Sequence, residues 1–366
     1  MKVFVSLLLV LLLAAAAAGA YLWYGIQEPY QGFSKDGVFV TIPHGTSARN
    51  AGRILQKNGV LRSEIAFEIY ARRNHRSLIA GEYLFDHPVS GKDVFWKLAH
   101  GEVYVLPFTV REGETMFDIA HELEAAKFMT ADEFLRAAND ASSIKDLAPH
   151  AKTLEGFLFP ATYQLPRHPV ATELAASMVQ KFREQWRAIA ASDPAPASVA
   201  RPALSTVTLA SLVERETPKP DERPLVAGVF ENRLTKGMLL QCDPTVIYAM
   251  EQVGAYNGSL TGKDLRYESP YNTYMHGGLP PGPIGNPGEV ALRAALAPAQ
   301  TDYLYFVANT HGGHFFAATL AEHNQNVNRY HRLLQGLPAD PPPAPPAKKK
   351  AKAPAHASGK KPAKKH

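Results

Sequence analysis

Cysteine is almost absent from this chain: among 366 residues there is one, Cys242. A single thiol cannot form a disulfide within the chain, so a small buried apolar side chain is the role that we favour for it. The zinc motif HExxH is also missing. His311 and His314 lie in an "HGGH" stretch without an obvious carboxylate partner, which favours a structural turn over a metal site. We therefore predict no metal and no other cofactor.

An excess of positive charge is also missing from most of the chain, although the formal net charge is +5. The tail from 338 to 366 holds eight lysines against Asp340, a net of +7, which leaves the remainder at −2. We therefore do not expect nucleic acid as a partner. The tail contains no large apolar side chain and is predicted to be disordered. A solvated extension is favoured over weak, salt-dependent attraction to an anionic polymer or lipid surface.

The first 24 residues contain an uncharged run from Val3 to Tyr24 that is long enough to cross a bilayer as a helix. A cleavable signal peptide is the alternative, but the run exceeds a normal signal core, so we predict a retained anchor. Lys2 is the one charge before the run, which predicts a cytoplasmic N-terminus. We thus expect a single-pass protein of the cytoplasmic (inner) membrane, with a linker at 25–36 and the bulk of the chain periplasmic or otherwise extracytoplasmic.

Two later segments are similar to each other, "FVTIPHGTSARNAGRILQKNGV" (39–60) and "FTVREGETMFDIAHELEAAKFM" (108–129). Each predicts a strand, a glycine turn and a helix, and three positions recur with identical spacing: Gly45, Leu55 and Val60 against Gly113, Leu123 and Phe128. The pattern resembles the opening of a LysM module, a β-α-α-β unit that binds N-acetylglucosamine polymers. A generic βα spacer is the alternative. We assign 37–145 to this LysM-like glycan-binding region.

The segments around these copies are also patterned. "GEYLF" (81–85) predicts a strand, "GKDVFWKLAHG" (91–101) a short helix, and 170–191 a longer helix with Leu174, Met178 and Phe182 on one face. A second domain is expected at 146–337, which makes the protein α+β, with a mixed catalytic domain after the anchor and the LysM-like region.

The stretch "SLVERETPKP" (211–220) carries two glutamates at the end of a predicted helix, with Ser205 as a possible N-cap. At about 100° per residue, Glu216 continues the apolar stripe of Leu209, Leu212 and Val213, whereas Glu214 leaves it. A carboxyl group on that face would have a raised pKa, as a general acid requires. The alternative is a solvated Glu216, or one paired with a nearby cation (Arg215, Lys219 or Arg223).

Polar and aromatic residues follow in two further motifs. Asp243 precedes Pro244 in "QCDPTVIYAM", where an N-cap role is favoured over catalysis, although a cap can also line a substrate site. The loop "ESPYNTYMHGGLPPGPIGNPG" (268–288) carries Tyr271, Asn272 and Tyr274. Aromatic rings stack on sugars and amides bond their hydroxyl groups, so this loop suits polysaccharide binding. A proline-rigid surface loop with packed tyrosines is the alternative.

These motifs together resemble the YceG family of endolytic murein transglycosylases, over nearly all of residues 3 to 335: "LASLVERET", "VFENRLTKGMLLQCDPTVIYAM", "YNTYMHGGLPPGPIGNPG" and "YLYFVANTHGGHFFAATLAEHN". The resemblance implies a lyase that cuts the β-1,4 bond between N-acetylmuramic acid and N-acetylglucosamine and leaves 1,6-anhydro ends. It implies that Glu216 is catalytic. Gln241, Asp243, Tyr271, Asn272 and Tyr274 would bind the sugar, and a peptidoglycan synthase would be a partner. Ala161 departs from the family, which commonly has an aspartate there.

Two other functions fit parts of the same pattern. A lysozyme-like hydrolase could use Glu216 together with Asp243. A non-catalytic, membrane-tethered scaffold could bind peptidoglycan without cutting it.

Overall fold

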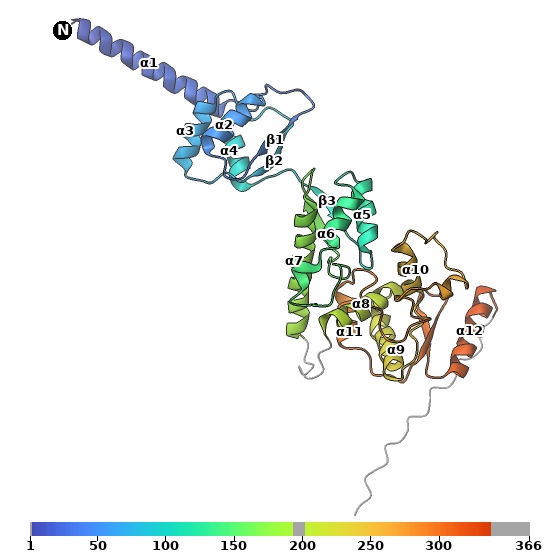
Figure 1. Ribbon diagram of the computed structural model, residues 1–366. Helices are drawn as coiled ribbons and strands as arrows, with labels where there is room; N and C mark the ends of the chain where they lie inside the picture. The colour runs from blue at the N-terminus through green and yellow to red at the C-terminus, as the bar shows by residue number, and fades with distance from the viewer. Residues whose placement is uncertain (1, 193–201, 338–366) are drawn as a thin grey trace, which may run out of the picture.

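The structure is a computed structural model that describes residues 2–192 and 202–337. The lysine-rich tail at 338–366 lies outside the described residues. In Figure 1 the chain follows its sequence order in space: a long N-terminal helix, a first small unit, a second small unit, and then the helices that carry the candidate site. The fold is mixed, with helices and three two-stranded antiparallel sheets among the described residues.

Helix α1 (Lys2–Gln27) projects away from the rest of the protein (Figure 1). Within the described part of the chain it is the helix long and apolar enough to cross a membrane, with a mean hydropathy of 2.7 over its best window. Its leucines and valines are exposed. In water such a surface would be unfavourable, so the helix fits a single-pass membrane anchor.

The first unit has the order β1 (Val38–Ile42), α2 (Ala48–Lys57), α3 (Glu64–Asn74), β2 (Gly81–Phe85) and α4 (Gly91–His100). Strands β1 and β2 pair antiparallel, with Val40 opposite Tyr83. Serine side chains cap the three helices, as the sequence of each turn favours. The apolar faces of these elements form one hydrophobic cluster, from Val40 to Leu98. The strand and helix predicted from "GEYLF" and "GKDVFWKLAHG" are confirmed as β2 and α4.

Residues 25–36, expected to be a linker, pack on the first unit. Ile26 is buried, and Tyr30 forms an isolated bridge with Val89. The Gly32 amide donates a hydrogen bond to the carbonyl of Gly59 (2.8 Å). The anchor helix is therefore joined to the first unit through a packed segment.

The second unit repeats the order of the first: β3 (Leu106–Thr109), α5 (Met116–Ala125), α6 (Ala131–Ala138), the 3₁₀ turn η1 (Ala141–Ile144) and β4 (Thr162–Leu165). The predicted strand, glycine turn and helix are confirmed in both copies. Gly45 and Gly113 have positive φ angles of 73° and 83°, which glycine adopts without strain. The equivalent Leu55 and Leu123 are fully buried.

A second hydrophobic cluster begins at Phe108 and continues to Ala295, so the two cores divide between residues 98 and 108. The boundary expected between 145 and 146 lies inside this second cluster. Helix α7 (Ala171–Ser192) matches the predicted helix at 170–191 within a residue. It packs on α6 and α11, which joins the second unit to the part that follows.

The remaining elements surround α8 (Ala203–Glu216), which packs on α9 (Arg223–Thr235), α10 (Asp243–Glu251) and α11 (Glu289–Leu296). The chain also forms the turns η3 (Pro220–Glu222) and η4 (Asp264–Arg266), the hairpin β5 (Tyr305–Ala308) and β6 (His314–Ala317), and α12 (Leu320–Leu334). The N-cap predicted at Ser205 is wrong. The N-cap is Pro202, three residues earlier, and α8 begins at Ala203; proline is tolerated at the start of a helix but not in its interior.

Candidate active site

Helix α8 positions the two glutamates, and its surroundings overturn the argument from helical periodicity. Every side chain from Thr206 to Glu214 is buried, so the helix has no solvent face over that stretch. Glu214, which the periodicity placed off the apolar face, is 8% exposed. Glu216 is only partly buried. Exposure by helical face therefore does not separate the two carboxyl groups; their partners do.

Glu214 is bound on both oxygens. Its Oε1 atom pairs with the guanidinium group of Arg223, and its Oε2 atom accepts a hydrogen bond from the backbone N–H of Gly288 (3.0 Å). The side chains of Glu214 and Arg223 are 4% and 5% exposed. A buried charge is stable only when it is paired and hydrogen-bonded, so this carboxylate holds α8, α9 and the loop before α11 together.

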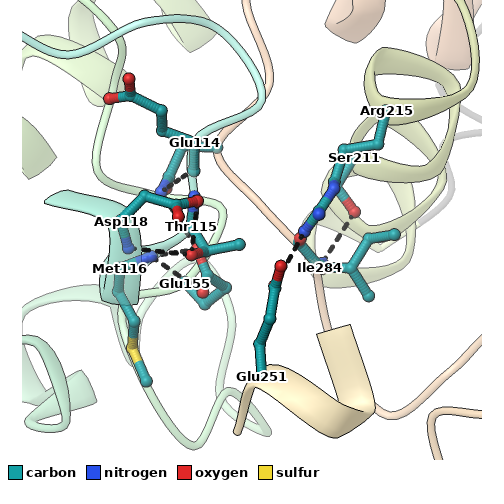
Figure 2. Close-up of polar contacts among 10 residues, drawn as sticks. Glu114, Thr115, Met116, Asp118, Glu155, Ser211, Arg215, Glu251 and Ile284 are labelled. Atoms are coloured by element: carbon teal, nitrogen blue, oxygen red, sulfur yellow. Dashed lines mark hydrogen bonds and ion pairs between the residues drawn. The ribbon is translucent and has the colours of Figure 1, made fainter. Parts of the chain in front are cut away.

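Arg215 has a second anchoring role, which Figure 2 shows. Its Nη1 atom donates to the carbonyl of Ile284 (2.8 Å) and lies 3.4 Å from Glu251 Oε2 at the end of α10. The Ile284 amide in turn donates to Ser211 Oγ (3.0 Å). The loop at 281–288 is thus fixed to one face of α8.

Glu216 differs from its neighbours because, within the described residues, no cation pairs with its carboxyl group. The hydrogen bond that it accepts comes from the Cys242 thiol, with 3.3 Å between Sγ and Oε2. Burial raises the pKa of Glu216 to about 7, the Cys242 hydrogen bond lowers it, and the charges of Asp243 and Arg233 raise and lower it respectively. This carboxyl group can hold a proton near neutral pH and release it, as a general acid and base must.

Arg233 places the segment that carries Cys242. Its side chain is buried on α9, and it donates to the carbonyls of Leu304 (2.7 Å) and Leu240 (2.8 Å). Its guanidinium carbon lies 5.3 Å from the centre of the Tyr305 ring. Arg233 lies within the quoted "VFENRLTKGM" motif but was not predicted as a site residue, because nothing local shows that one of its partners, Leu304, lies 71 residues away.

Thr273 joins the two motifs that precede α10 and follow η4. Its carbonyl accepts from the Gln241 amide (3.1 Å), and its Oγ1 atom accepts from the Cys242 amide (3.0 Å). Gln241 has a φ of 51°, a left-handed conformation that turns the chain sharply before Cys242. The side chain of Gln241 is exposed beside these bonds.

Asp243 has a different role from the predicted one. The N-cap position of α10 falls on Cys242, and no side chain makes a cap hydrogen bond there. Asp243 is instead the first residue of the helix, and its Oδ1 atom accepts from the Tyr274 hydroxyl (2.5 Å). The capping role favoured for Asp243 is therefore wrong. Asp243 lies inside the helix, and its carboxylate bonds Tyr274 and not the backbone of the first turn. Its negative charge acts on Glu216.

Asn272 and Tyr271, both predicted to bind sugar, make their contacts within the protein. Asn272 is fully buried, and its amide donates to the carbonyls of Leu265 (3.1 Å) and Tyr267 (2.8 Å) while accepting from the Tyr274 amide (2.9 Å). It shapes the loop that presents Tyr274. The Tyr271 ring packs against the Tyr248 ring at a tilt of 54°, with ring centres 5.0 Å apart. The structure thus gathers Glu216, Gln241, Asp243 and Tyr274, with Asn272 behind them and Tyr271 packed against α10.

The second histidine of "HGGH" has a carboxylate partner that local sequence could not show. His314 Nδ1 lies 2.7 Å from Glu222 Oε2, and its backbone amide donates to Glu222 Oε1 (3.0 Å). Glu222 also accepts from the Thr217 hydroxyl (3.4 Å), directly after Glu216. The hairpin β5–β6 is thereby joined to the end of α8.

A further buried acid, Glu155, lies where the second unit meets this region (Figure 2). It is 2% exposed, it accepts from the Met116 amide in the first turn of α5 (3.1 Å), and Asn286 Nδ2 donates to it (3.0 Å). Burial is the largest cause that raises the pKa of Glu155, to about 8. Asn286 is buried as well and bonds the backbone of Gly156 and Leu158, so this cluster fixes the "LEGFLFP" segment.

The proton on Glu155 makes stability depend on pH. Between about 4.5 and about 8, the folded protein keeps a proton that the unfolded chain has released. Glu155 should therefore make the free energy of unfolding fall as pH rises through this range, by up to about 1.4 kcal/mol per pH unit, and its contribution should level off above it. Glu214 and Glu216, whose pKa values burial raises to about 7, add to the slope below that pH. Chemical denaturation at a series of pH values measures this slope. Glu155→Gln should be less pH-dependent whatever its absolute stability; an unchanged slope would contradict the assignment.

Comparison with known proteins identifies the family of this chain. The sequence profile described as the YceG-like family matches residues 40–329, most of the chain. The chain belongs to the YceG-like family. The matched residues include the end of α8, the Gln241–Asp243 segment, the loop with Tyr274 and the hairpin with His314.

Similar proteins include curated relatives and a solved structure. The chain is 36% identical to a protein of Bacillus subtilis named endolytic murein transglycosylase, over 85% of this chain and 90% of that one. It is 30% identical to a protein of the same name from Streptococcus pneumoniae, over 89% of this chain and 65% of the relative. The crystal structure of a yceG-like protein from Listeria monocytogenes is 32% identical, with a TM-score of 0.53, and covers 80% of this chain and 99% of its own.

Proposed function

We propose that this YceG-like protein is an endolytic murein transglycosylase, the activity for which its curated relatives are named. The observation that carries the proposal is Glu216. It is a partly buried carboxyl group with a pKa of about 7, next to a thiol and without a cation partner among the described residues. Glu214, two residues earlier, is consumed by its ion pair. The substrate is the glycan strand of peptidoglycan.

One titrating carboxyl group is enough for the reaction. Protonated Glu216 gives its proton to the glycosidic oxygen as the bond from muramyl C1 to that oxygen breaks. The carboxylate then takes the proton of the muramyl C6 hydroxyl while that oxygen bonds to C1. The products are a free 4-hydroxyl group on N-acetylglucosamine and a 1,6-anhydro-muramyl end. No water is added, so a second catalytic carboxylate is not required.

The residues beside Glu216 are suited to hold the sugar. Asp243 is exposed, its charge acts on Glu216, and it accepts a hydrogen bond from the half-buried Tyr274 hydroxyl, so a carboxylate and an aromatic ring adjoin the reacting group. The exposed Gln241 comes directly before Cys242, whose thiol donates to Glu216. Such a set can bond hydroxyl and acetamido groups and pack on a pyranose face. Asn272 would act through the loop that it shapes, and Tyr271 through its packing on Tyr248.

Product analysis tests the proposed reaction. Purified glycan strands digested by the full-length protein should give fragments with 1,6-anhydro ends, one water lighter in the mass spectrum than hydrolysis products. Fragments with free reducing muramyl ends would replace the lyase by a hydrolase in which Asp243, whose charge acts on Glu216, assists a water. Binding without any cleavage would leave a peptidoglycan-binding scaffold.

The two β-α-α-β units support a role in glycan binding by LysM-like modules. Each has an antiparallel pair of strands connected through two helices, with the same glycine turn before the first helix. Residues 37–145 are the proposed glycan-binding region, and 146–337 the proposed catalytic region. The first unit has a core of its own, so pull-down of insoluble peptidoglycan by residues 25–104 fused to a carrier protein, with the carrier alone as control, tests this part.

The position of α1 supports a location outside the cytoplasm. With Lys2 before the span, we place the N-terminus in the cytoplasm and the enzyme on the outer side of the cytoplasmic membrane. There it would act on strands as a peptidoglycan synthase makes them, and cleavage within a nascent strand would end its elongation. Crosslinking in cells followed by detection of a synthase tests the partner.

Cys242 should set the pH at which activity falls. Because the free enzyme needs a protonated Glu216, cleavage should decrease as pH rises through about 7. The thiol hydrogen bond favours the carboxylate, so Cys242→Ala should raise the pKa of Glu216 and move the fall to higher pH by about 0.5 to 1 unit. Cys242→Ser keeps a donor and serves as the matched control. The pH dependence of kcat/KM decides; equal shifts in both variants would contradict the role of the hydrogen bond.

A further inference from the structure

Helix α3 carries an apolar face that the protein leaves uncovered. Ala66, Phe67 and Ala71 point into the first unit and are buried. On the other side, Ile65 and Ile69 are 58% and 50% exposed. Residues four positions apart lie on the same face of a helix, so these two isoleucines form one outward apolar strip. The two exposed isoleucines form a small apolar patch that would gain from leaving water.

This strip lies at the end of the anchor helix. α3 packs on α1, and Gly25 of α1 faces Ser63 and Ala66 so closely that a methyl group there would contact both. In Figure 1, α3 lies next to the C-terminal end of α1, and the axes of the two helices cross at a steep angle. If α1 crosses a bilayer, α3 lies along the lipid surface. Exposed aromatic side chains at the end of α1, Tyr21 and Trp23, are the kind found at that level.

Several side-chain contacts connect α1 to the first unit. The guanidinium carbon of Arg62 lies 4.7 Å from the ring centres of both Tyr24 and Tyr30, so a cation is held between two aromatic rings on either side of the helix end. Ile26 is buried against Gly91. The unit therefore cannot turn α3 away from the membrane without breaking these contacts.

The charge around the strip suits anionic lipid. The segment 62–76 contains four arginines against Glu64 and Glu68, a net of +2. Glu68 is paired with Arg72 at 2.6 Å, which leaves Arg73 and Arg76 at the far end of α3. Arginines at the surface attract anionic headgroups, and their aliphatic stems can lie along the acyl boundary.

We propose that the outward face of α3, with Ile65, Ile69 and the following arginines, docks on the lipid surface at which α1 leaves the membrane. The proposal rests on α1 being a bilayer span. The helix lies in the interface with its two isoleucines among the headgroups and the outer acyl segments, as amphipathic interfacial helices do. The first unit is then fixed against the bilayer, which sets the distance from the membrane at which glycan strands are met.

Site-directed fluorescence on the full-length protein in vesicles tests the docking. An environment-sensitive dye is attached to Ile65→Cys, to Ile69→Cys, to Val10→Cys in α1, and to Val253→Cys, an exposed apolar position after α10. The native Cys242 is 1% exposed, and the protein without an added cysteine reports its background labelling. Vesicles of phosphatidylcholine with and without phosphatidylglycerol carry a lipid-bound quencher.

The expected result is blue-shifted, lipid-quenched emission at positions 65, 69 and 10, water-like emission at 253, and stronger quenching at 65 and 69 when phosphatidylglycerol is present. Quenching at position 10 with water-like emission at 65 and 69 overturns the docking and leaves the anchor intact. Water-like emission at position 10 overturns the anchor and the docking together. Neither result depends on transglycosylase activity, so both are separate from the proposed reaction.

Discussion

Glu216→Gln should reduce cleavage of glycan strands by about a thousandfold, the scale of a lost general acid and base. Glutamine has the same shape and can still accept the thiol hydrogen bond of Cys242, but it cannot give a proton to the glycosidic oxygen. The assay is the rate at which 1,6-anhydro ends form, with parental and variant proteins side by side. The unfolding midpoint should stay close to the parental one.

Two controls keep this result interpretable. Glu184→Gln changes a carboxyl group on α7 that is 51% exposed and lies outside the proposed site, so this variant should cleave at the parental rate. The Glu216→Gln protein should still bind peptidoglycan, because the proposed glycan-binding units are unchanged. A Glu216→Gln protein that folds and cuts at the parental rate would remove Glu216 from the mechanism.

Arg223→Met should lower the free energy of unfolding by about 3 to 5 kcal/mol, because it leaves the Glu214 carboxylate buried without its cation. The two side chains are 5% and 4% exposed, so water cannot replace the lost partner. The effect is structural: α8, α9 and the loop at Gly288 meet at Glu214. Chemical denaturation of the full-length protein in detergent measures it.

A second replacement separates the buried charge from simple loss of contact. Glu214→Gln combined with Arg223→Met removes both charges and keeps an acceptor for the Gly288 amide, so it should recover most of the lost stability. Lys181→Met breaks an ion pair whose side chains are 44% and 51% exposed, and should cost less than about 1 kcal/mol. A double variant as unstable as Arg223→Met alone would show that the buried charge is not the cause.

The two predictions assign opposite tasks to glutamates two positions apart in one helix. Glu214 has a guanidinium group and an amide on its oxygens, so its replacement should affect folding. Glu216 has one weak thiol donor and no cation partner among the described residues, so its replacement should affect chemistry. Burial raises the pKa of both carboxyl groups to about 7, so it is their partners and not their pKa values that separate them. Arg215, between them, holds the loop at Ile284. Glu214 and Arg215 thus fix the end of α8, and this holds the Glu216 carboxyl group in a defined position.

Much of the local structure could be predicted from the sequence alone. The apolar run of α1, the two strand–glycine–helix copies and the helix at α7 follow from periodicity and turn chemistry over short windows, and those signals are local. The ordered motifs from α8 to the β5–β6 hairpin were enough to indicate the family. The helical wheel does not separate Glu216 from Glu214, because α8 is buried on every side there; the family resemblance is what predicts Glu216 as the catalytic residue.

Most of the predicted strands and helices, the repeat and the candidate catalytic residues can thus be read from the chain alone, because each depends on neighbours within a few turns. The tertiary structure decided which carboxyl group is unpaired, since the partners come from distant segments: Gly288 lies 74 residues from Glu214, and Cys242 lies 26 from Glu216. Asp243 was predicted to cap a helix but bonds Tyr274, 31 residues away. Asn272 was predicted to bind sugar but bonds the backbone of its own loop. Periodicity shows which side chains share a face; it cannot show what packs on a helix that is buried on every side.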